Sequence, residues 1–172
     1  MIWEKGWPVI NPGKGIVELE GQMPNLPFTP WPSTPVCDHF ESEKLALTWN
    51  FIRTPRDDFW SLSERKSHLR LYAKPEMITD EVNPSFIGRR QQHQSFAVRT
   101  KVAFTSAGEN EKAGIVLLQN KDYQYRLEYN GTGIECIQRV SGEDKVLNRV
   151  DYTANQLFIK VEATEEEYSF YI

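Results

Sequence analysis

Alternation of apolar and polar residues with a period of two dominates the second half of the chain. It is clearest in three segments, residues 69–73, 123–129 and 157–163. Successive side chains of a strand point to opposite faces, so this period predicts half-buried β-strands. Asn130-Gly131, where both turn positions are expected to have positive φ, and the run SGED at 141–144 predict tight turns. The sequence therefore predicts consecutive antiparallel hairpins.

Two more segments are predicted to be strands. One has an apolar face and the other does not. In LTWNFI at 47–52, Trp49 and Phe51 fall on one face and are expected in the core. In FIGRRQQHQSF at 86–96, polar side chains fall on both faces, so no side is apolar.

Helical patterns are nearly missing from the sequence. Only ESEKLAL at 41–47 has the composition of a short helix, and strands do not alternate with helices as in parallel-sheet proteins. An all-β fold with an antiparallel two-sheet sandwich is the natural architecture for this pattern.

The first 35 residues have a different composition. Seven of the ten prolines lie there, and the stretch MPNLPFTPWPSTP at 23–35 predicts an extended linker, because proline fixes φ and removes N–H donors. The large apolar side chains of Leu26, Phe28 and Trp31 predict that this linker lies along a surface of the sandwich. Before it, WPVI predicts one short strand that ends near a turn at Pro12-Gly13.

Composition and charge exclude several classes of function. With 172 residues, 40% hydrophobic and 26% charged, the chain predicts one main globular domain. The formal charge of -4, with basic residues scattered along the chain, predicts no nucleic-acid partner. No apolar run approaches transmembrane length and no secretory signal is visible, so no membrane association is predicted. Cys37 and Cys136 predict two free thiols and hence a reducing, cytoplasmic compartment.

Residues able to support catalysis are sparse. Glycosidases need two carboxylates facing each other across a sugar, and the expected Glu-x-Asp or Glu-x-Glu spacing within a strand is missing. Asp57-Asp58 and Glu165-Glu166-Glu167 are predicted to lie in solvated loops. His39, His68 and His93 lack metal-ligand spacing, so no metal, no cofactor and no catalytic residue is predicted.

Exposed aromatic residues offer a second possibility. A sugar ring can stack on an indole, and Trp60, which follows the polar loop TPRDD, is the candidate sugar-stacking residue. An independent carbohydrate-binding module is therefore the alternative function.

Three long segments resemble a known family. The runs are DHFESEKLALTWNFIRTPRDDFWSLSERKSHLRLY, PSFIGRRQQHQSFAVRTKVAF and EKAGIVLLQNKDYQYRLEY. They are similar to the C-terminal concanavalin A-like sandwich of glycoside hydrolase family 43, the β-xylosidases and α-L-arabinofuranosidases. The resemblance implies a jelly-roll sandwich over residues 37–172 that lacks its last strands, a linker over 21–36, and the last strand of a propeller catalytic domain over 1–20.

The resemblance also implies a function. The catalytic carboxylates of the family lie in the propeller, so this chain alone is expected to be catalytically silent. It would serve as an ancillary domain that shapes the active-site mouth and the subunit contacts of a homo-oligomer. The parent enzyme would act on xylo- or arabino-oligosaccharides in xylan breakdown.

The polar segment gains a role from the same resemblance. Interfaces between domains of one chain are more polar than cores and favour arginine. The candidate interface residues are Arg89, Arg90, Gln91, Gln92 and His93. The alternative is that Arg89 and Arg90 pair with local acids, namely Asp57, Asp58 or Glu64.

Overall fold

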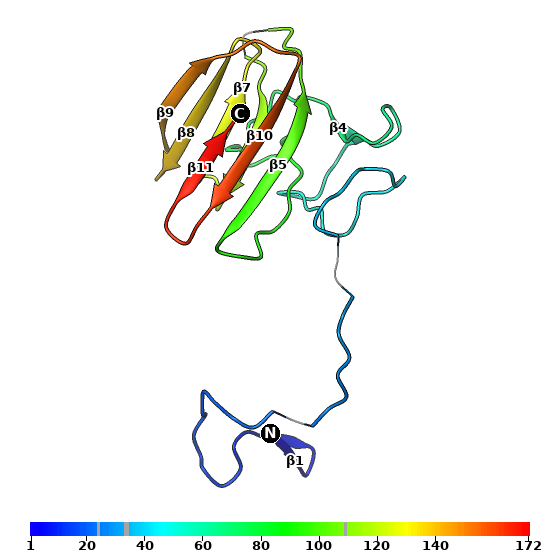
Figure 1. Ribbon diagram of the computed structural model, residues 1–172, viewed down its shortest axis with the longest axis vertical. Helices are drawn as coiled ribbons and strands as arrows, with labels where there is room; N and C mark the ends of the chain where they lie inside the picture. The colour runs from blue at the N-terminus through cyan, green and yellow to red at the C-terminus, as the bar shows by residue number, and fades with distance from the viewer. Residues whose placement is uncertain (24, 33–34, 109) are drawn as a thin grey trace. The chain divides into compact units, whose positions relative to one another are not determined.

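The computed structural model describes residues 1–23, 25–32, 35–108 and 110–172 (Figure 1). These residues form two compact units, Met1–Cys37 and Asp38–Ile172. They contain β-strands and no helix, so none of them belongs to a helix that could cross a membrane. The segment 41–47 has bends and turns in place of the short helix that the sequence suggested.

The larger sheet of the second unit has four antiparallel strands in sequential order. They are β6 (Ala113–Leu118), β7 (Gln124–Tyr129), β8 (Gly133–Val140) and β9 (Glu143–Asp151). Each neighbouring pair is joined by a short connection, so the sheet is a meander of consecutive hairpins. The predictions of a strand over 123–129 and of consecutive hairpins are therefore confirmed.

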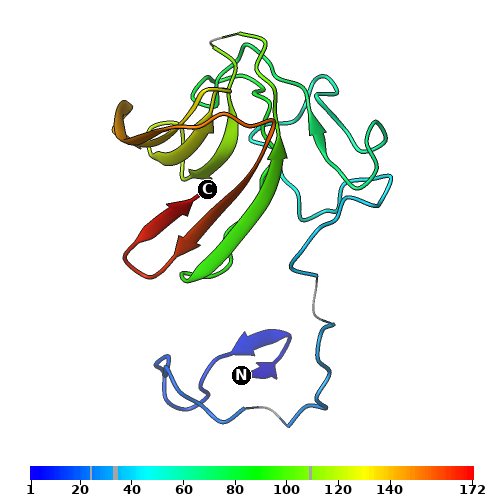
Figure 2. The ribbon, with the colours of Figure 1, turned by 45° about the horizontal axis from the view of Figure 1, so that its top comes forward.

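The second sheet has three antiparallel strands, which lie side by side in Figure 2. They are β5 (Phe96–Ala103), β10 (Gln156–Ala163) and β11 (Tyr168–Tyr171), in the order β11-β10-β5. The predicted strand over 157–163 is confirmed as β10. The two edges of this sheet differ in charge: β5 carries Arg99 and Lys101, whereas β11 carries no charged residue.

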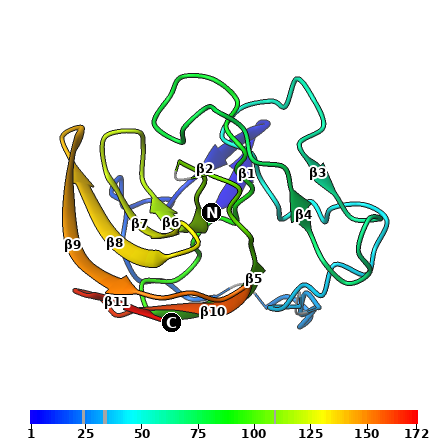
Figure 3. The same ribbon diagram turned by 90° about the horizontal axis from the view of Figure 1, so that it is seen from above.

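The hydrophobic core lies between these two sheets, which form two layers in Figure 3. Leu127, Tyr129 and Ile134 come from the four-stranded sheet, and Leu157 and Ile159 come from β10. Burial of each aliphatic side chain contributes about 1.5–3 kcal/mol to folding. This packing confirms the predicted all-β antiparallel sandwich.

Tyr129 links the end of β7 to the loop before β10. Its side chain is 1% exposed, so its hydroxyl needs hydrogen-bond partners inside the protein. The hydroxyl accepts a hydrogen bond from the Ala154 amide at 2.9 Å and lies 2.6 Å from the Ala154 carbonyl oxygen, to which it can donate. One buried side chain thus connects the end of β7 with the loop that leads from one sheet to the other.

The two predicted turns have different geometries. Between β7 and β8, Gly131 has positive φ and Asn130 does not; the Asn130 side chain instead accepts hydrogen bonds from the amides of Thr132 and Gly133. The expectation of two positive φ values at Asn130-Gly131 is therefore wrong, although the hairpin is present. Between β8 and β9, Ser141 and Gly142 both have positive φ, at 52° and 83°.

The two segments of less regular pattern do not form the predicted strands. In 47–52 and 86–96, pairing outside β5 is limited to a single bridge between Asn50 and Gly88. Trp49 and Phe51 are half-buried and lie outside the main core cluster, so the prediction that both are core residues is wrong. The period of two in these segments is not sufficient for a strand, because a strand also needs partners along its length.

A short two-stranded sheet follows the Asn50 bridge. Strand β3 (Trp60–Ser61) pairs with β4 (Arg70–Leu71), so the strand predicted over 69–73 is present only in part. The Tyr72 amide continues this pairing by donating to the Phe59 carbonyl at 2.8 Å. These contacts fix the backbone on both sides of Trp60.

The first unit contains a hairpin where one strand was expected. Strand β1 (Ile2–Glu4) pairs with β2 (Trp7–Val9), which covers most of the predicted WPVI strand. The Pro12-Gly13 turn is present, because Lys14 N donates to Asn11 O at 3.1 Å and Gly13 has φ 84°. The assignment of residues 1–20 to a propeller stays a prediction.

Positions 24, 33 and 34 of the predicted linker lie outside the described residues. Leu26, Phe28 and Trp31 are all exposed within the first unit. The prediction that they lie on a sandwich surface is not tested by the structure.

Candidate functional site

The polar segment Arg89–His93 starts directly after the Asn50–Gly88 bridge. The two bridge residues exchange backbone hydrogen bonds of 2.7 and 2.9 Å. A Cβ at position 88 would lie 2.5 Å from the ring of Phe86, so a larger residue would displace that ring. Gly88 therefore fixes the point at which the polar segment begins.

Arg89 lies against a small cluster at the start of the second unit. Its guanidinium is 5.7 Å from the centre of the Trp49 ring, within the range of a cation–π contact. The Trp49 indole N–H donates to Asp38 Oδ2 at 2.7 Å, and Phe40 packs on the indole with ring centres 5.5 Å apart. The hydrogen bond from Trp49 lowers the pKa of Asp38, and burial opposes this effect. The hydrogen bond from the Phe40 amide and the charge of Arg89 lower the pKa further.

The other four residues of the segment present their side chains to solvent. All are exposed, and the Gln91 side-chain amide donates to the His93 carbonyl at 2.8 Å. Within the described parts of the chain, Arg90 and Gln92 make no side-chain hydrogen bond or ion pair. The segment therefore offers a set of donors with few internal partners.

The acids suggested as local partners of the arginines are engaged elsewhere or do not pair with Arg90. Asp57 forms an ion pair with Lys74 at 3.1 Å, and Glu64 forms one with Arg70 at 3.1 Å. No ion pair of Asp58 occurs in the part of the chain that the structure describes. Arg90 therefore does not form an ion pair with any of the three local acids.

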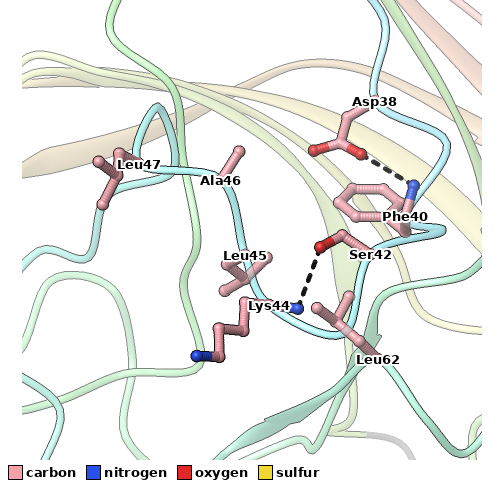
Figure 4. A pocket seen from close by; sticks show the side chains of 8 residues that line it. All are labelled: Asp38, Phe40, Ser42, Lys44, Leu45, Ala46, Leu47 and Leu62. Carbon is pink, nitrogen blue, oxygen red and sulfur yellow. Dashed lines mark hydrogen bonds between the residues drawn. The ribbon is translucent and has the colours of Figure 1, made fainter.

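A pocket of about 270 Å³ lies beside Asp38 (Figure 4). Apolar side chains of Phe40, Leu45 and Leu62 line it, together with the single carboxylate of Asp38. Asp38 Oδ1 accepts a hydrogen bond from the Phe40 amide at 2.8 Å, so this carboxylate supports the backbone. One structural carboxylate does not provide the acid and base that glycoside hydrolysis needs.

A second pocket, of about 380 Å³, has Trp60 in its lining. Its lining combines two aromatic rings with charged groups and comprises Phe51, Pro55, Arg56, Asp57, Asp58 and Trp60. The centres of the Phe51 and Trp60 rings are 4.9 Å apart, and both rings pack on Phe59, which is 3% exposed. The structure therefore places the predicted sugar-stacking residue in a pocket, although ligand binding itself stays a prediction.

Neither pocket is lined by the pair of facing carboxylates that glycoside hydrolysis needs or by the group of ligands that a metal ion needs. Asp57 and Asp58 are consecutive and Asp57 is bound to Lys74, so they do not form carboxylates on opposite sides of a scissile bond. Among the described residues, no group of three His, Cys, Asp or Glu side chains is placed to hold a metal ion.

Sequence reasoning missed two features of these sites. Asp38 and Trp49 are 11 residues apart, and no local motif links them. Arg56 was not singled out either, although its place in TPRDD next to a candidate stacking residue was a usable signal.

Comparison with known proteins identifies relatives over nearly the whole chain. A family model described as "Beta xylosidase C-terminal Concanavalin A-like domain" matches residues 37–172. A Bacteroides ovatus protein named "Non-reducing end alpha-L-arabinofuranosidase BoGH43B" is 38% identical over 182 aligned residues, which cover 100% of this chain and 34% of that protein. A Butyrivibrio fibrisolvens protein named "Xylosidase/arabinosidase" is 39% identical over 74% of this chain and 25% of its own length.

Solved structures agree with this match. The structure titled "Bacteroides ovatus Xyloglucan PUL GH43B" is 34% identical, with a TM-score of 0.82, and the alignment covers 98% of this chain and 34% of that chain. The chain thus spans a quarter to a third of the length of the relatives named here.

Proposed function

Because this chain belongs to the family of β-xylosidase C-terminal concanavalin A-like domains, the sandwich of glycoside hydrolase family 43, we propose that it is a non-catalytic ancillary domain of such a glycosidase. The main support is the family match over residues 37–172, together with relatives that are about three times longer than the matched region. The absence of facing carboxylates from both described pockets is consistent with this role.

The proposed partner of the sandwich is the propeller catalytic domain of the same protein. Residues 1–20 would contribute the last strand of that propeller, residues 21–36 would be the linker, and residues 37–172 would be the sandwich. In this proposal the exposed donors of Arg90, Gln92 and His93 contact carbonyls and carboxylates of the propeller. The cation–π contact of Arg89 with Trp49 supports it, because it holds the start of the segment in place.

The proposed substrate class follows from the names of the relatives. These are arabinofuranosidases and xylosidases, so the parent enzyme would remove terminal xylose or arabinose from xylan-type oligosaccharides. The proposed contribution of this chain is to shape the mouth of the active site and the contacts between subunits.

The first experiment tests whether the chain itself is catalytic. Purified chain is incubated with nitrophenyl β-xyloside and nitrophenyl α-L-arabinofuranoside, and we expect no release of nitrophenol. Turnover that disappears when a carboxylate of this chain, such as Asp58, is replaced by asparagine would overturn the proposal. The asparagine variant also excludes a contaminating host enzyme.

A second experiment tests the polar segment. A chimera is made in which this chain replaces the matching region of the Bacteroides ovatus relative, and the double variant Arg90→Ser, Gln92→Ser is compared with it. We expect the variant to destabilise the joined domains by about 1–2 kcal/mol, because donors at the interface lose their partners. Arg65→Ser, an exposed arginine elsewhere on the sandwich, is the control and should change stability little. Equal effects of the two changes would contradict the assignment of the interface.

A further inference from the structure

The aromatic side chains around Trp60 form a rigid group separate from the main core. Phe59 is buried, and its ring contacts Phe51 at 5.8 Å and Trp60 at 5.2 Å between centres, both edge to face. The backbone on both sides is fixed by the pairing of Trp60 with Leu71 and by the hydrogen bond of Tyr72 to Phe59. Phe51 and Trp60 are half-buried and line the pocket, so the rings are held in place before any ligand arrives.

Some polar side chains that line this pocket already have a partner within the protein, and others do not. Asp57 is used, since Lys74 binds it at 3.1 Å and also lies 5.9 Å from the centre of the Phe59 ring. Within the described residues, the side chains of Arg56 and Asp58 make no hydrogen bond or ion pair, and the Trp60 indole N–H has no acceptor. The pocket thus presents one acceptor and two kinds of donor beside an aromatic surface.

We propose that this pocket binds the pyranose rings of a neutral oligosaccharide, with Trp60 and Phe51 as the stacking surface and Arg56 and Asp58 as hydrogen-bonding groups. A pyranose ring has an apolar face of C–H groups that packs on an aromatic ring, and hydroxyls around its edge that both donate and accept. Asp58 accepts from these hydroxyls, whereas Arg56 and the Trp60 indole donate to them. The volume of about 380 Å³ lies in the usual range for small-molecule sites.

The charges of the pocket favour a neutral sugar over an acidic one. Asp57 is balanced by Lys74, and Arg56 and Asp58 carry opposite charges, so the pocket has no excess positive charge. A uronic acid would gain no net attraction from this pocket, and its carboxylate would be repelled by Asp58, which has no cation bound to it among the described residues. The choice of a pentose within the neutral class rests on the proposed function of the parent enzyme.

This proposal goes beyond the ancillary role, which needs no sugar binding by the chain itself. The two can fail separately. If the chain binds no sugar but remains silent in hydrolysis and supports the chimera, only the binding site is lost. If the chain binds sugar but hydrolyses aryl glycosides through its own carboxylates, the ancillary role is lost.

The experiment is calorimetric titration of the full chain with three probes: xylohexaose, cellohexaose and hexagalacturonic acid. We expect xylohexaose to bind at one site and hexagalacturonic acid to bind at least about tenfold more weakly. Cellohexaose, a neutral hexose chain, tests whether the pocket prefers pentoses; equal binding would overturn the pentose assignment and leave the neutral class in place. No binding of any neutral probe, or equal binding of the acidic probe, would overturn the proposed site.

Variants locate the binding. Trp60→Ala should weaken xylohexaose binding about tenfold or more, since truncation of a central aromatic residue removes most of the contact energy. Asp58→Asn is the second variant, because Asp58 is exposed and its replacement leaves the fold intact; it should weaken binding severalfold. Phe158→Ala, which removes an aromatic side chain 67% exposed on β10, is the control and should leave binding unchanged. Binding that is unaffected by Asp58→Asn and Trp60→Ala, or that is lost equally in Phe158→Ala, would contradict the site.

Discussion

Arg126 holds Asp144 through two hydrogen bonds, from Nη2 to Oδ2 at 2.7 Å and from Nη1 to Oδ1 at 3.3 Å. The Arg126 side chain is only 5% exposed, whereas that of Asp144 is 39% exposed. Nε of Arg126 also donates to Glu128 at 2.7 Å, and Arg139 binds Asp144 from the neighbouring strand at 2.8 Å. The pair therefore connects β7 with β9 across β8, on the face of the sheet opposite to the core.

Replacing Asp144 by asparagine should destabilise the second unit. A buried guanidinium then loses one of its two charged partners, and the loss of such hydrogen bonds typically costs about 1.5–3 kcal/mol. Urea denaturation followed by fluorescence measures this change in unfolding free energy. The control is Glu162→Gln, which breaks an exposed pair with Lys160 and should cost much less than Asp144→Asn, because solvent screens that pair. A cost for Asp144→Asn no larger than that of the control would contradict the structural role of the pair.

The same pair predicts a pH dependence of stability. The hydrogen bond from Arg126, followed by that from Arg139 and the charges of both, lowers the pKa of Asp144 below its ordinary value of 3.8 despite burial. Because the folded-state pKa is depressed, the stabilisation is present above the ordinary value and is lost as pH falls through the folded-state pKa. The difference in stability between the wild type and Asp144→Asn should therefore shrink as the pH is lowered from about 7 towards about 3. A difference that stays constant over this range would count against the prediction.

Removal of the Tyr129 hydroxyl should also be costly. In Tyr129→Phe the amide and carbonyl of Ala154 lose the partner that they contact inside the protein, and an unsatisfied buried group costs about 1–3 kcal/mol. Thermal denaturation of Tyr129→Phe and Tyr123→Phe gives the comparison. Tyr123 is 40% exposed and its hydroxyl contacts Ser141, so water can replace that contact. Similar melting temperatures for the two variants would show that the Tyr129 contact is not important.

The two cysteines should differ in reactivity. Cys37 is exposed, whereas Cys136 is partly buried in β8, and burial raises the pKa of its thiol above the ordinary value of 9.0. Since the thiolate is the reactive form, a thiol-specific reagent should modify the native protein in a fast and a slow phase. Cys37→Ser should remove the fast phase and Cys136→Ser the slow one. A single phase for the wild type would be inconsistent with these environments.

Self-association of the chain is expected through an uncovered sheet edge. Strand β11 lies at the edge of its sheet, carries no charged residue and ends with Phe170 and Tyr171, and such edges recruit another strand. Sedimentation of the wild type at increasing concentration should show dimers. Ser169→Lys places a charge on this edge and should shift the equilibrium to monomers. A strictly monomeric wild type would contradict this prediction and that of a homo-oligomer.

Strands that pair with neighbouring strands along their length could be predicted from the sequence. The irregular structure of segments without such partners could not. In 123–129 the period of two coincides with pairing along both sides of β7. In 157–163 it coincides with pairing of all of β10 with β5 and of its second half with β11. In 47–52 and 86–96 the same period is present, but only Asn50 and Gly88 find a partner. Alternation reports which side chains share a face, and it does not report whether a partner strand is available.

The candidate sites were only partly visible in the sequence for a similar reason. Trp60 could be identified because a large aromatic residue follows a polar loop. The contact of Arg89 with Trp49 joins residues far apart in the chain, and it depends on the single bridge at Gly88. The turn at Asn130 was predicted at the correct place, but its side chain satisfies the amides that follow, so a second positive φ is not needed.

The difference in charge between the two edges of the β11-β10-β5 sheet would limit how far copies of this protein could associate through that sheet. Two molecules joined through β11 would form one continuous six-stranded sheet about a twofold axis. The outer edges of that sheet would both be β5, and further growth would bring Arg99 and Lys101 of one pair against the same residues of the next. Repulsion between these like charges opposes addition of a third copy. If the chain associates through β11, it is therefore expected to stop at a pair instead of extending into a fibril.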